Sequence, residues 1–433
     1  MKLPARVAAP IILALLCAGT LMGFLWWQLA QSAKLLTEGE HEETGQVIRR
    51  DAPTEGVTAP AGNAAVAYLR QGDLLALQGR WAEAQERYEL AVGEGGDLPA
   101  LRKLAQAQLQ RRDIEGVRST IKRMKSSGAK PEDLLLLESI VHLRTGELVK
   151  ARTILENAQD SPQQHYGLAL LGIIEGAHEQ VQQELKLVMN GWEPILRSNA
   201  KTLLSAYDEY ALFPESPEIH LVTLLSRALA QVQECELALP LLHQVTQKQT
   251  DYRDAWIVQG YCELTTERAQ QAIVSLEQAY NIDPQKPEIQ YFLGRAHAAT
   301  GDSVNAITFL EYAIANGFQP EAEARQELAR EALKVGKGEV ALAQYALLVQ
   351  KEDATIEMFE GLVQTSIALG QLERAELGAR GATERFPQKG RAFELLGDTL
   401  RAQKREEEAR EAYQQAIQLD PFLLSAKEKL GEE

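Results

Sequence analysis

The sequence has few aromatic residues, few prolines and glycines, and a shortage of basic residues. Its 433 residues include 16 prolines and 31 glycines, too few for a collagen-like or low-complexity chain, and 45% are hydrophobic, as in folded proteins. Aromatic residues make up only 6%, and the abundance of Ala, Leu, Glu and Gln favours helices. Lys and Arg number 45 against 61 Asp and Glu, a net charge of −16. We therefore expect no nucleic-acid partner, because binding the phosphate backbone needs clustered basic residues.

Recognisable catalytic and metal-binding patterns are also missing. The seven histidines are scattered, and none occurs in the His-Glu-x-x-His pattern that places two zinc ligands on one face of a helix. There is no Gly-x-x-x-x-Gly-Lys-Ser/Thr phosphate loop and no Gly-x-Ser-x-Gly nucleophile turn. We expect no catalytic site, no cofactor and no metal, and hence no enzymatic activity.

What the sequence does contain begins with a long apolar segment near the N-terminus. No residue from Val7 to Leu29 is charged, and a helix of about 20 such residues crosses the hydrocarbon layer of a bilayer. Trp26 and Trp27 close the segment, where indole rings favour the membrane interface. We predict a single transmembrane helix within residues 1–33, kept as an uncleaved signal anchor.

The charges around this segment predict its orientation. Lys2 and Arg6 precede it and acidic residues follow it, which keeps the N-terminus in the cytoplasm. In a bacterium the chain would then be a single-pass protein of the inner membrane with its body in the periplasm. A cleaved signal peptide is one alternative, because residues 30–32 (Ala-Gln-Ser) have small side chains at the right spacing. Reversed topology, with the body in the cytoplasm, is another. Residues 34–62 are expected to form a flexible acidic linker.

The rest of the chain repeats itself about every 34 residues. Units start near residues 65, 98, 132, 219, 253, 287, 322, 356 and 390, and the last five starts are 34, 35, 34 and 34 residues apart. The unit from residue 390 has apolar or small residues and a final proline at positions 4, 7, 8, 11, 20, 24, 27 and 32: Phe393, Leu396, Gly397, Leu400, Ala409, Tyr413, Ala416 and Pro421. Position 15 is glycine in five units, which suits a tight turn: Gly79, Gly146, Gly301, Gly336 and Gly370.

This pattern resembles the tetratricopeptide repeat, a helical hairpin, at each of its signature positions, over about residues 65–425. The resemblance implies an all-α fold, an α-solenoid of about nine to ten hairpins behind the N-terminal transmembrane helix. Small residues at positions 8 and 20 let the two helices approach, and large residues fill the gaps to neighbouring helices. Each hairpin leaves an apolar face that only its neighbour covers, so the array is stable as a stack. With its predicted anchor, the chain is similar to bacterial membrane-anchored tetratricopeptide proteins.

One segment, residues 163–218, departs from this frame. We interpret it as a degenerate repeat plus an extra helix, between N-terminal repeats in 63–162 and C-terminal repeats in 219–433. It is either a hinge or an irregular but rigidly stacked repeat. Residues 422–430 at the end of the chain predict a short helix that caps the last hairpin.

Two of the three cysteines lie in the repeats. Cys235 is at position 17 of its unit and Cys262 at position 10 of the next, both towards the turn end of stacked hairpins. A disulfide is chemically permitted if the body is periplasmic, provided that the Cα atoms come within about 7 Å. The alternative is two buried free thiols that pack as small hydrophobic residues.

In tetratricopeptide proteins the first helices of successive hairpins line a concave groove. The resemblance implies a set of candidate partner-binding residues at groove-facing positions: Tyr261, Tyr291, Phe292, Arg295, Arg330, Gln364, Asp398 and Arg401. Aromatic residues beside arginine suit a peptide-binding strip, because both are enriched at binding hot spots. The alternative is that they coat a solvated groove. Tyr291 and Arg295 stand where the family's clamp for C-terminal carboxylates has Lys and Asn, which argues against binding of chaperone tails.

These features lead to one functional hypothesis and two alternatives. We expect a non-catalytic, membrane-anchored scaffold that binds partner proteins or peptides in the groove. The setting would be a cell-envelope assembly, secretion, pilus, polysaccharide or cytochrome-maturation complex. The alternatives are a structural protein that self-assembles into homo-oligomers and a repeat subunit of an enzyme complex.

Overall fold

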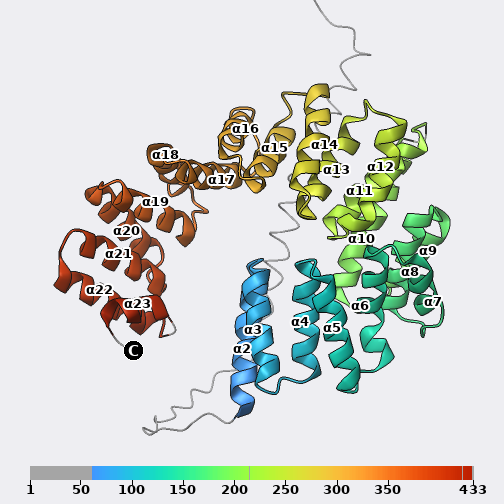
Figure 1. The fold of residues 1–433 in the computed structure, drawn as a ribbon, viewed down its shortest axis with the longest axis horizontal. Coiled ribbons are helices and arrows are strands. Elements are labelled where there is room, and N and C mark those ends of the chain that lie inside the picture. The colour runs from blue at the N-terminus through green and yellow to red at the C-terminus, as the bar shows by residue number, and fades with distance from the viewer. Residues whose placement is uncertain (1–60, 214, 422, 432–433) are drawn as a thin grey trace, which may run out of the picture. The chain divides into compact units, whose positions relative to one another are not determined.

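The computed structural model describes residues 61–213, 215–421 and 423–431. These residues form 22 helices and no strand, which confirms the all-α class for this part of the chain (Figure 1). The anchor predicted at 1–33, and the linker predicted at 34–62 up to residue 60, lie outside the described residues. None of the described helices is long and apolar enough to span a bilayer.

Twenty of these helices pair into ten hairpins. The hairpins before residue 190 are α2 (Ala61–Leu77) with α3 (Trp81–Gly93), α4 (Leu98–Gln110) with α5 (Ile114–Ser126), α6 (Pro131–Arg144) with α7 (Leu148–Glu156), and α8 (Pro162–Glu175) with α9 (His178–Met189). Those after residue 217 are α11 (Glu218–Gln231) with α12 (Cys235–Lys248), α13 (Arg253–Thr265) with α14 (Ala269–Ile282), α15 (Pro287–Ala299) with α16 (Ser303–Ala315), α17 (Glu321–Lys334) with α18 (Gly338–Leu348), α19 (Ile356–Ala368) with α20 (Leu372–Arg385), and α21 (Gly390–Ala402) with α22 (Glu406–Leu419). Two helices have no hairpin partner, α10 (Pro194–Ala211) and α23 (Leu424–Leu430).

Within the hairpins α15–α16 and α21–α22, a glycine at position 8 faces a large residue at position 24. A Cβ atom added to Gly397 would lie 2.6 Å from the ring of Tyr413, and one added to Gly294 would lie 2.7 Å from Leu310. No side chain fits at such distances, so glycine is what lets these helices approach. The alanines at position 20 complete the contact and are buried, as Ala306 shows. The packing predicted from the repeat pattern is confirmed at these positions.

All ten hairpin turns contain a residue in the left-handed region at position 15. In six turns this residue is glycine, which adopts positive φ without a steric penalty: Gly79, Gly146, Gly176, Gly301, Gly336 and Gly370. In the other four turns it is Arg112, Gln233, Glu267 and Lys404, with φ between +59° and +69°. The turn geometry is thus kept even where the sequence lacks the glycine that favours it.

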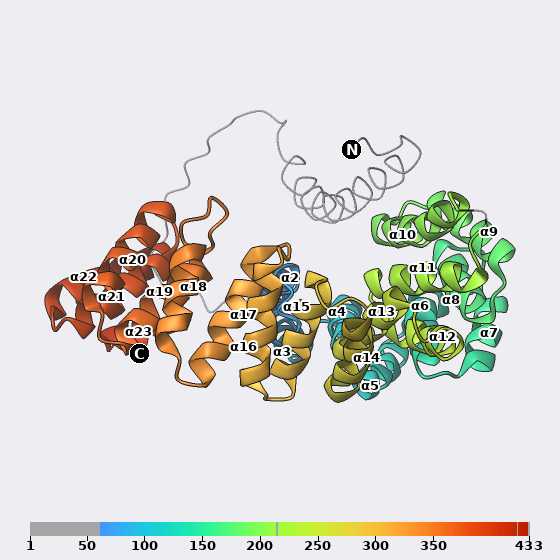
Figure 2. The ribbon, with the colours of Figure 1, turned by 90° about the horizontal axis from the view of Figure 1, so that it is seen from above.

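Successive hairpins stack on one another in chain order (Figure 2). The first helices of neighbouring hairpins also meet, α13 with α15, α15 with α17, and α19 with α21. First helices therefore lie side by side along α13, α15 and α17, and again along α19 and α21.

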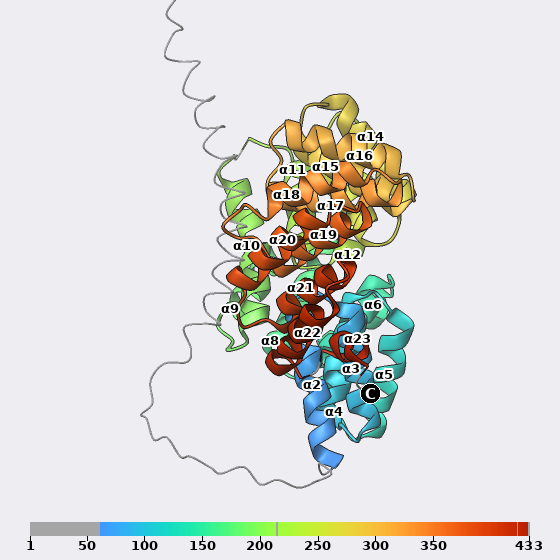
Figure 3. The same ribbon diagram turned by 90° about the vertical axis from the view of Figure 1, so that its left-hand side faces the viewer.

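The segment 163–218 contains the hairpin α8–α9, except for the first residue of α8, and the whole of the single helix α10 with its flanking turns. Because α10 packs between α9 and α11, it interrupts the alternation of first and second helices. The structure also brings α12 beside α6, six helices earlier in the chain (Figure 3). This contact lies outside the nearest-neighbour stacking of the repeats.

Candidate partner-binding surface

Position 9 carries a polar side chain in each of five first helices, α13, α15, α17, α19 and α21. Because these helices lie along one side of the array, we call this side the first-helix surface. The row consists of Tyr261, Arg295, Arg330, Gln364 and Asp398. All five belong to the residues predicted from the sequence, and the other three predicted residues lie on the same helices, but the eight differ in accessibility.

The aromatic end of the surface lies on α13 and α15. The rings of Tyr261 and Phe292 are both half-buried and meet edge to face, with centroids 5.4 Å apart. Tyr291 is only 4% exposed and its ring stacks on Phe318 at 4.0 Å. The ring of Tyr291 is therefore part of the core. The accessible aromatic pair consists of Tyr261 and Phe292.

Polar contacts of Tyr291 tie the aromatic end to the neighbouring helix. Its hydroxyl donates to Glu323 on α17 at 3.3 Å. The guanidinium carbon of Arg295 lies 5.7 Å from the centroid of the Tyr291 ring, at the distance of a cation–π contact. Burial raises the pKa of the Tyr291 phenol, so the hydroxyl stays a hydrogen-bond donor at neutral pH.

The middle of the surface is the most accessible. The Arg330 side chain is 57% exposed and pairs with Glu327 on its own helix at 2.6 Å. Gln364 is exposed and donates to Glu360 at 2.9 Å. Exposed ion pairs of this kind contribute little to stability, so their groups can exchange these partners for those of a bound polypeptide at small cost.

At the far end, Asp398 and Arg401 are engaged by the terminal helix. Asp398 accepts a hydrogen bond from the Tyr413 hydroxyl at 2.8 Å and pairs with Lys429 of α23 at 2.7 Å. Arg401 lies over the Tyr413 ring at 4.6 Å and donates to the main-chain oxygen of Lys429 at 2.6 Å. Both predicted binding residues therefore hold α23 in place.

The first hairpin shows the same arrangement. Asp73 accepts from the Tyr88 hydroxyl at 2.8 Å and pairs with Lys103 of the next first helix, α4, at 3.0 Å. By this likeness α23 occupies the place of the first helix of a further hairpin. The recurrence of Asp, Tyr and Lys at matching positions is visible in the sequence, and it is the signal by which the role of Lys429 could have been found.

Glu394 is a further residue at this end, at another groove-facing position of the repeat. Its side chain is fully buried on α21, where it pairs with Lys429 at 2.8 Å and also with Arg391. Burial alone would raise the pKa of Glu394, but hydrogen bonds from Lys429, Ser425 and Arg391 hold it below its usual range. Glu394 is therefore ionised at neutral pH and anchors α23 as well.

The described residues also contain a disulfide and a cavity. A disulfide joins Cys235 to Cys262, with Cα atoms 5.0 Å apart. The sequence left open a disulfide or two free thiols, and the structure has the disulfide. A cavity of about 190 Å³ lies between α8, α11 and α12, and none of the predicted surface residues lines it. Among the described residues no group of three or more His, Cys, Asp or Glu side chains is placed to hold a metal ion.

Comparison with known proteins identifies the repeats. Models of the tetratricopeptide repeat match residues 223–287, 263–330 and 361–423. Residues 223–330 and 361–423 are therefore tetratricopeptide repeats, a fold that generally binds peptides and proteins and is non-catalytic. No curated protein matches the chain.

Several solved structures are similar to parts of the chain. YrrB, a tetratricopeptide protein with an unusual peptide-binding site, is 18% identical over 43% of this chain and 96% of its own, with a TM-score of 0.38. PilW, a type IV pilus biogenesis factor, is 18% identical over 50% of this chain and 99% of its own, with a TM-score of 0.40. The Cut9–Hcn1 hetero-tetramer of the APC/C matches at 16% identity over 85% of this chain and 75% of its own, with a TM-score of 0.38.

Proposed function

We propose that this protein is a membrane-anchored scaffold that binds segments of partner polypeptides on its first-helix surface. The charge-free segment from Val7 to Leu29 supports the anchor, and the acidic residues that follow support a periplasmic body. The proposed setting is an envelope assembly such as a secretion, pilus, polysaccharide or cytochrome-maturation complex.

The observation that carries this proposal is the accessible pair Tyr261 and Phe292 beside exposed polar groups. An aromatic edge that is half-buried in the free protein offers apolar area for an incoming side chain. Arg330 and Gln364, farther along the surface, offer hydrogen bonds to the main chain or to carboxylates of the same segment. A partner segment of mixed apolar and acidic character fits this order of groups.

Site-specific photo-crosslinking in membranes tests the binding surface. A photoreactive residue replaces Gln364 on the first-helix surface, and the control position is Val304 on the second helix α16, which is 61% exposed. We expect crosslinked partner from position 364 and not from 304, and loss of it with Arg330→Glu, whose exposed side chain leaves the fold intact. Equal crosslinking at both positions would contradict a specific surface.

The anchor and its orientation have a separate test. A reporter that is active only outside the cytoplasm is fused after Glu433, and the membrane fraction is blotted for the uncut chain. An active, membrane-bound fusion supports the proposed topology. A soluble fusion would point to a cleaved signal peptide, and an inactive one would move the search for partners to the cytoplasm.

Self-assembly is the second candidate, because the two ends of the array differ. The free face of α2 exposes three apolar side chains, Val66, Leu74 and Leu77, to 46%, 61% and 72%. Terminal repeats usually carry a polar outer face. If copies associate through α2, light scattering will show a mass that rises with concentration and falls back to the monomer with Leu74→Glu. A monomer at all concentrations would exclude this candidate.

A further inference from the structure

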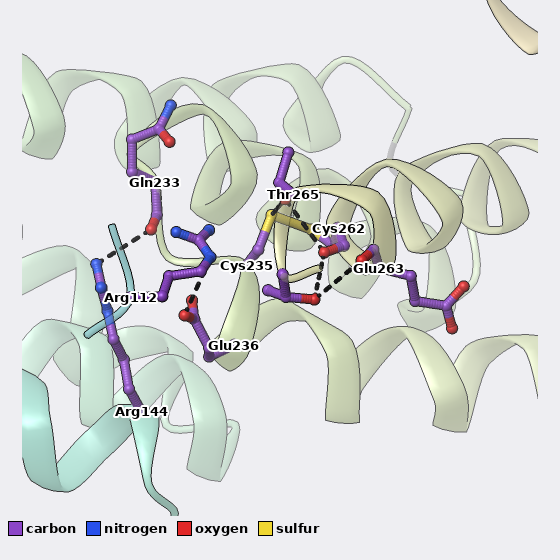
Figure 4. The surroundings of a disulfide bond; sticks show 9 residues. Arg112, Arg144, Gln233, Cys235, Glu236, Cys262, Glu263 and Thr265 are labelled. Carbon is purple, nitrogen blue, oxygen red and sulfur yellow. Dashed lines mark hydrogen bonds and ion pairs between the residues drawn. A yellow bond between two sulfur atoms is a disulfide. The ribbon is translucent and has the colours of Figure 1, made fainter. Parts of the chain in front are cut away.

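The contact between α6 and the α11–α12 turn joins parts of the chain that the repeat does not bring together. Arg144 at the end of α6 donates from Nε and Nη2 to the carboxylate of Glu234, 90 residues away, at 2.8 and 3.0 Å. It also donates to the main-chain oxygen of Leu109 at 2.8 Å. A further hydrogen bond goes to the main-chain oxygen of Gln233 at 3.2 Å (Figure 4). The side chains of Arg144 and Glu234 are 4% and 5% exposed, so this ion pair is buried.

A second ion pair lies next to the first and makes fewer hydrogen bonds. Nε of Arg112, in the α4–α5 turn, is 3.3 Å from Oε1 of Glu236, and both side chains are 14% exposed. Nη2 of Arg112 and Oε2 of Glu236 are buried without a hydrogen-bond partner. A buried pair of this kind regains little of its desolvation cost. We define the clamp as Arg112, Arg144, Glu234 and Glu236.

The disulfide lies between the two glutamates of the clamp. Cys235 is the first residue of α12, so Glu234 and Glu236 flank it directly. It is bonded to Cys262 of α13, and its sulfur accepts a hydrogen bond from the Thr265 hydroxyl at 3.2 Å. The bond therefore fixes the main chain from which both glutamates project, and Figure 4 shows Glu236 next to Cys235.

We propose that the Cys235–Cys262 disulfide is a redox-controlled lock on the clamp. In the oxidised chain the first turn of α12 is fixed to α13, and its glutamates hold α4 and α6 against the C-terminal repeats. A dithiol reductant would transfer two electrons and two protons, breaking the S–S bond, forming two thiols and becoming a disulfide itself. The first turn of α12 then loses its covalent restraint, and the clamp opens more often.

The position of the lock gives residues 163–218 a defined role. This segment connects the two groups of repeats that the clamp joins, so an open clamp leaves it as the only link between them along the chain. In the oxidised protein the segment is held at both ends, and in the reduced protein it is free to act as a hinge. The lock thus decides which of the two interpretations of this segment applies.

Hydrogen exchange measured by mass spectrometry on the full chain tests the lock. The reporter amides are those of residues 107–113 and 139–147, which carry the arginines of the clamp. We expect their exchange to become about tenfold faster when dithiothreitol reduces the disulfide, because the local opening free energy falls. Amides of α19 and α20 serve as the internal control. Unchanged exchange at the reporter amides in chain whose mass proves reduction would overturn the proposal.

Cysteine variants provide a measurement that does not depend on access of the reductant to the bond. Cys235→Ala with Cys262→Ala is expected to exchange fast at the reporter amides without reductant and to be insensitive to it. The matched control is Cys17→Ala, which should behave as the unmodified chain. If the double variant exchanges as slowly as the oxidised chain, the disulfide does not hold the clamp.

A third variant decides whether the effect passes through the clamp. With Glu234→Gln the reporter amides should exchange fast even with the disulfide intact, and reduction should add less than about twofold. If reduction still accelerates exchange about tenfold in this variant, the disulfide acts by another route and the proposal fails.

Discussion

The regular repeats from α13 to α22 and the irregular region from α6 to α12 are held together in different ways. In the regular part, ion pairs join the start of a hairpin to the end of the same hairpin, as in Arg253 with Asp283 and Lys351 with Glu321, both separated by 30 residues. In the irregular part, Arg144 reaches Glu234 over 90 residues, and a disulfide lies beside this contact. Where α10 interrupts the alternation of helices, contacts of long sequence separation supplement stacking.

The two regions also differ in what a broken contact costs. The side chains of Lys351 and Glu321 are 33% and 30% exposed, so water solvates either one when its partner is removed. Arg144 and Glu234 are almost fully buried, so water cannot solvate either one when its partner is removed. The comparison predicts that losing one partner costs more stability at the pair Arg144–Glu234 than at the pair Lys351–Glu321.

The largest effect is expected from Glu234→Ala in the irregular region. It leaves the guanidinium of Arg144 buried without its counter-charge, which typically costs about 3–5 kcal/mol. Urea unfolding followed by circular dichroism measures the loss. The control is Glu327→Ala, which removes the partner of the exposed Arg330 and should cost less than about 1 kcal/mol. Equal losses in the two variants would remove the distinction between the regions.

Gly397→Ala should produce the next largest effect, in the regular region. The new Cβ would lie 2.6 Å from the Tyr413 ring, so the hairpin α21–α22 must open. Overpacking of this kind costs about 1–3 kcal/mol, measurable as a lower urea midpoint. The matched control is Gly93→Ala at the end of α3, where a Cβ meets no atom within 4 Å and stability should be unchanged or slightly higher. A neutral Gly397→Ala would show that these hairpins adapt more easily than their packing indicates.

A smaller effect, and a gain, is expected at two hairpin turns that lack glycine. Lys404→Gly in the regular region removes the steric cost of a left-handed non-glycine residue, which stabilises the fold by about 1–2 kcal/mol. The greater chain entropy of glycine in the unfolded state offsets about 0.5–1 kcal/mol of this gain. The net gain should be about 0.5–1 kcal/mol in thermal or urea unfolding. Gln233→Gly makes the same change in the turn that carries the clamp. A smaller gain there would mean that the clamp already imposes the turn conformation.

The smallest effect is expected from acid in the regular region. Hydrogen bonds from Gln403 and Arg380, with a further one from Arg405, lower the pKa of Glu376 to about 2. Because the folded-state pKa lies below the unfolded one, the stabilisation is complete above about pH 4.5 and is lost as pH falls towards 2. With a side chain 21% exposed, we expect less than about 1 kcal/mol. Glu376→Gln should reduce the change of the urea midpoint between pH 5 and about 3. The control is Glu373→Gln, at an exposed position on the same helix, which should leave this pH dependence as it is.

The sequence predicted the regular region well, because each residue there has its partners within one repeat. The unit starts at 253, 287 and 356 are the first residues of α13, α15 and α19, and all five glycines at position 15 lie in left-handed turns. The pattern could not reveal the clamp, since Arg144 and Glu234 belong to units separated by the interruption at α10. No rule of spacing relates residues on its two sides.

On the first-helix surface, the sequence could not show where a neighbour outside the pattern covers a residue. Tyr291 stands at a groove-facing position, but Phe318, which follows α16, stacks on its ring. Asp398 and Arg401 are occupied by α23, a helix too short to show the repeat signature. Arg330 and Gln364 are exposed, and their role as binding residues stays a prediction.

The disulfide has a mechanical consequence for a chain that carries load between its ends. Under tension, repeat arrays extend hairpin by hairpin, each releasing its own length of chain. The chain between Cys235 and Cys262, which are 27 residues apart in sequence, cannot extend while the disulfide is intact. At 3.3–3.6 Å per residue, the extended length of this segment is about 90 Å. An oxidised chain stretched between two anchoring points is therefore about 90 Å shorter at full extension than a reduced one.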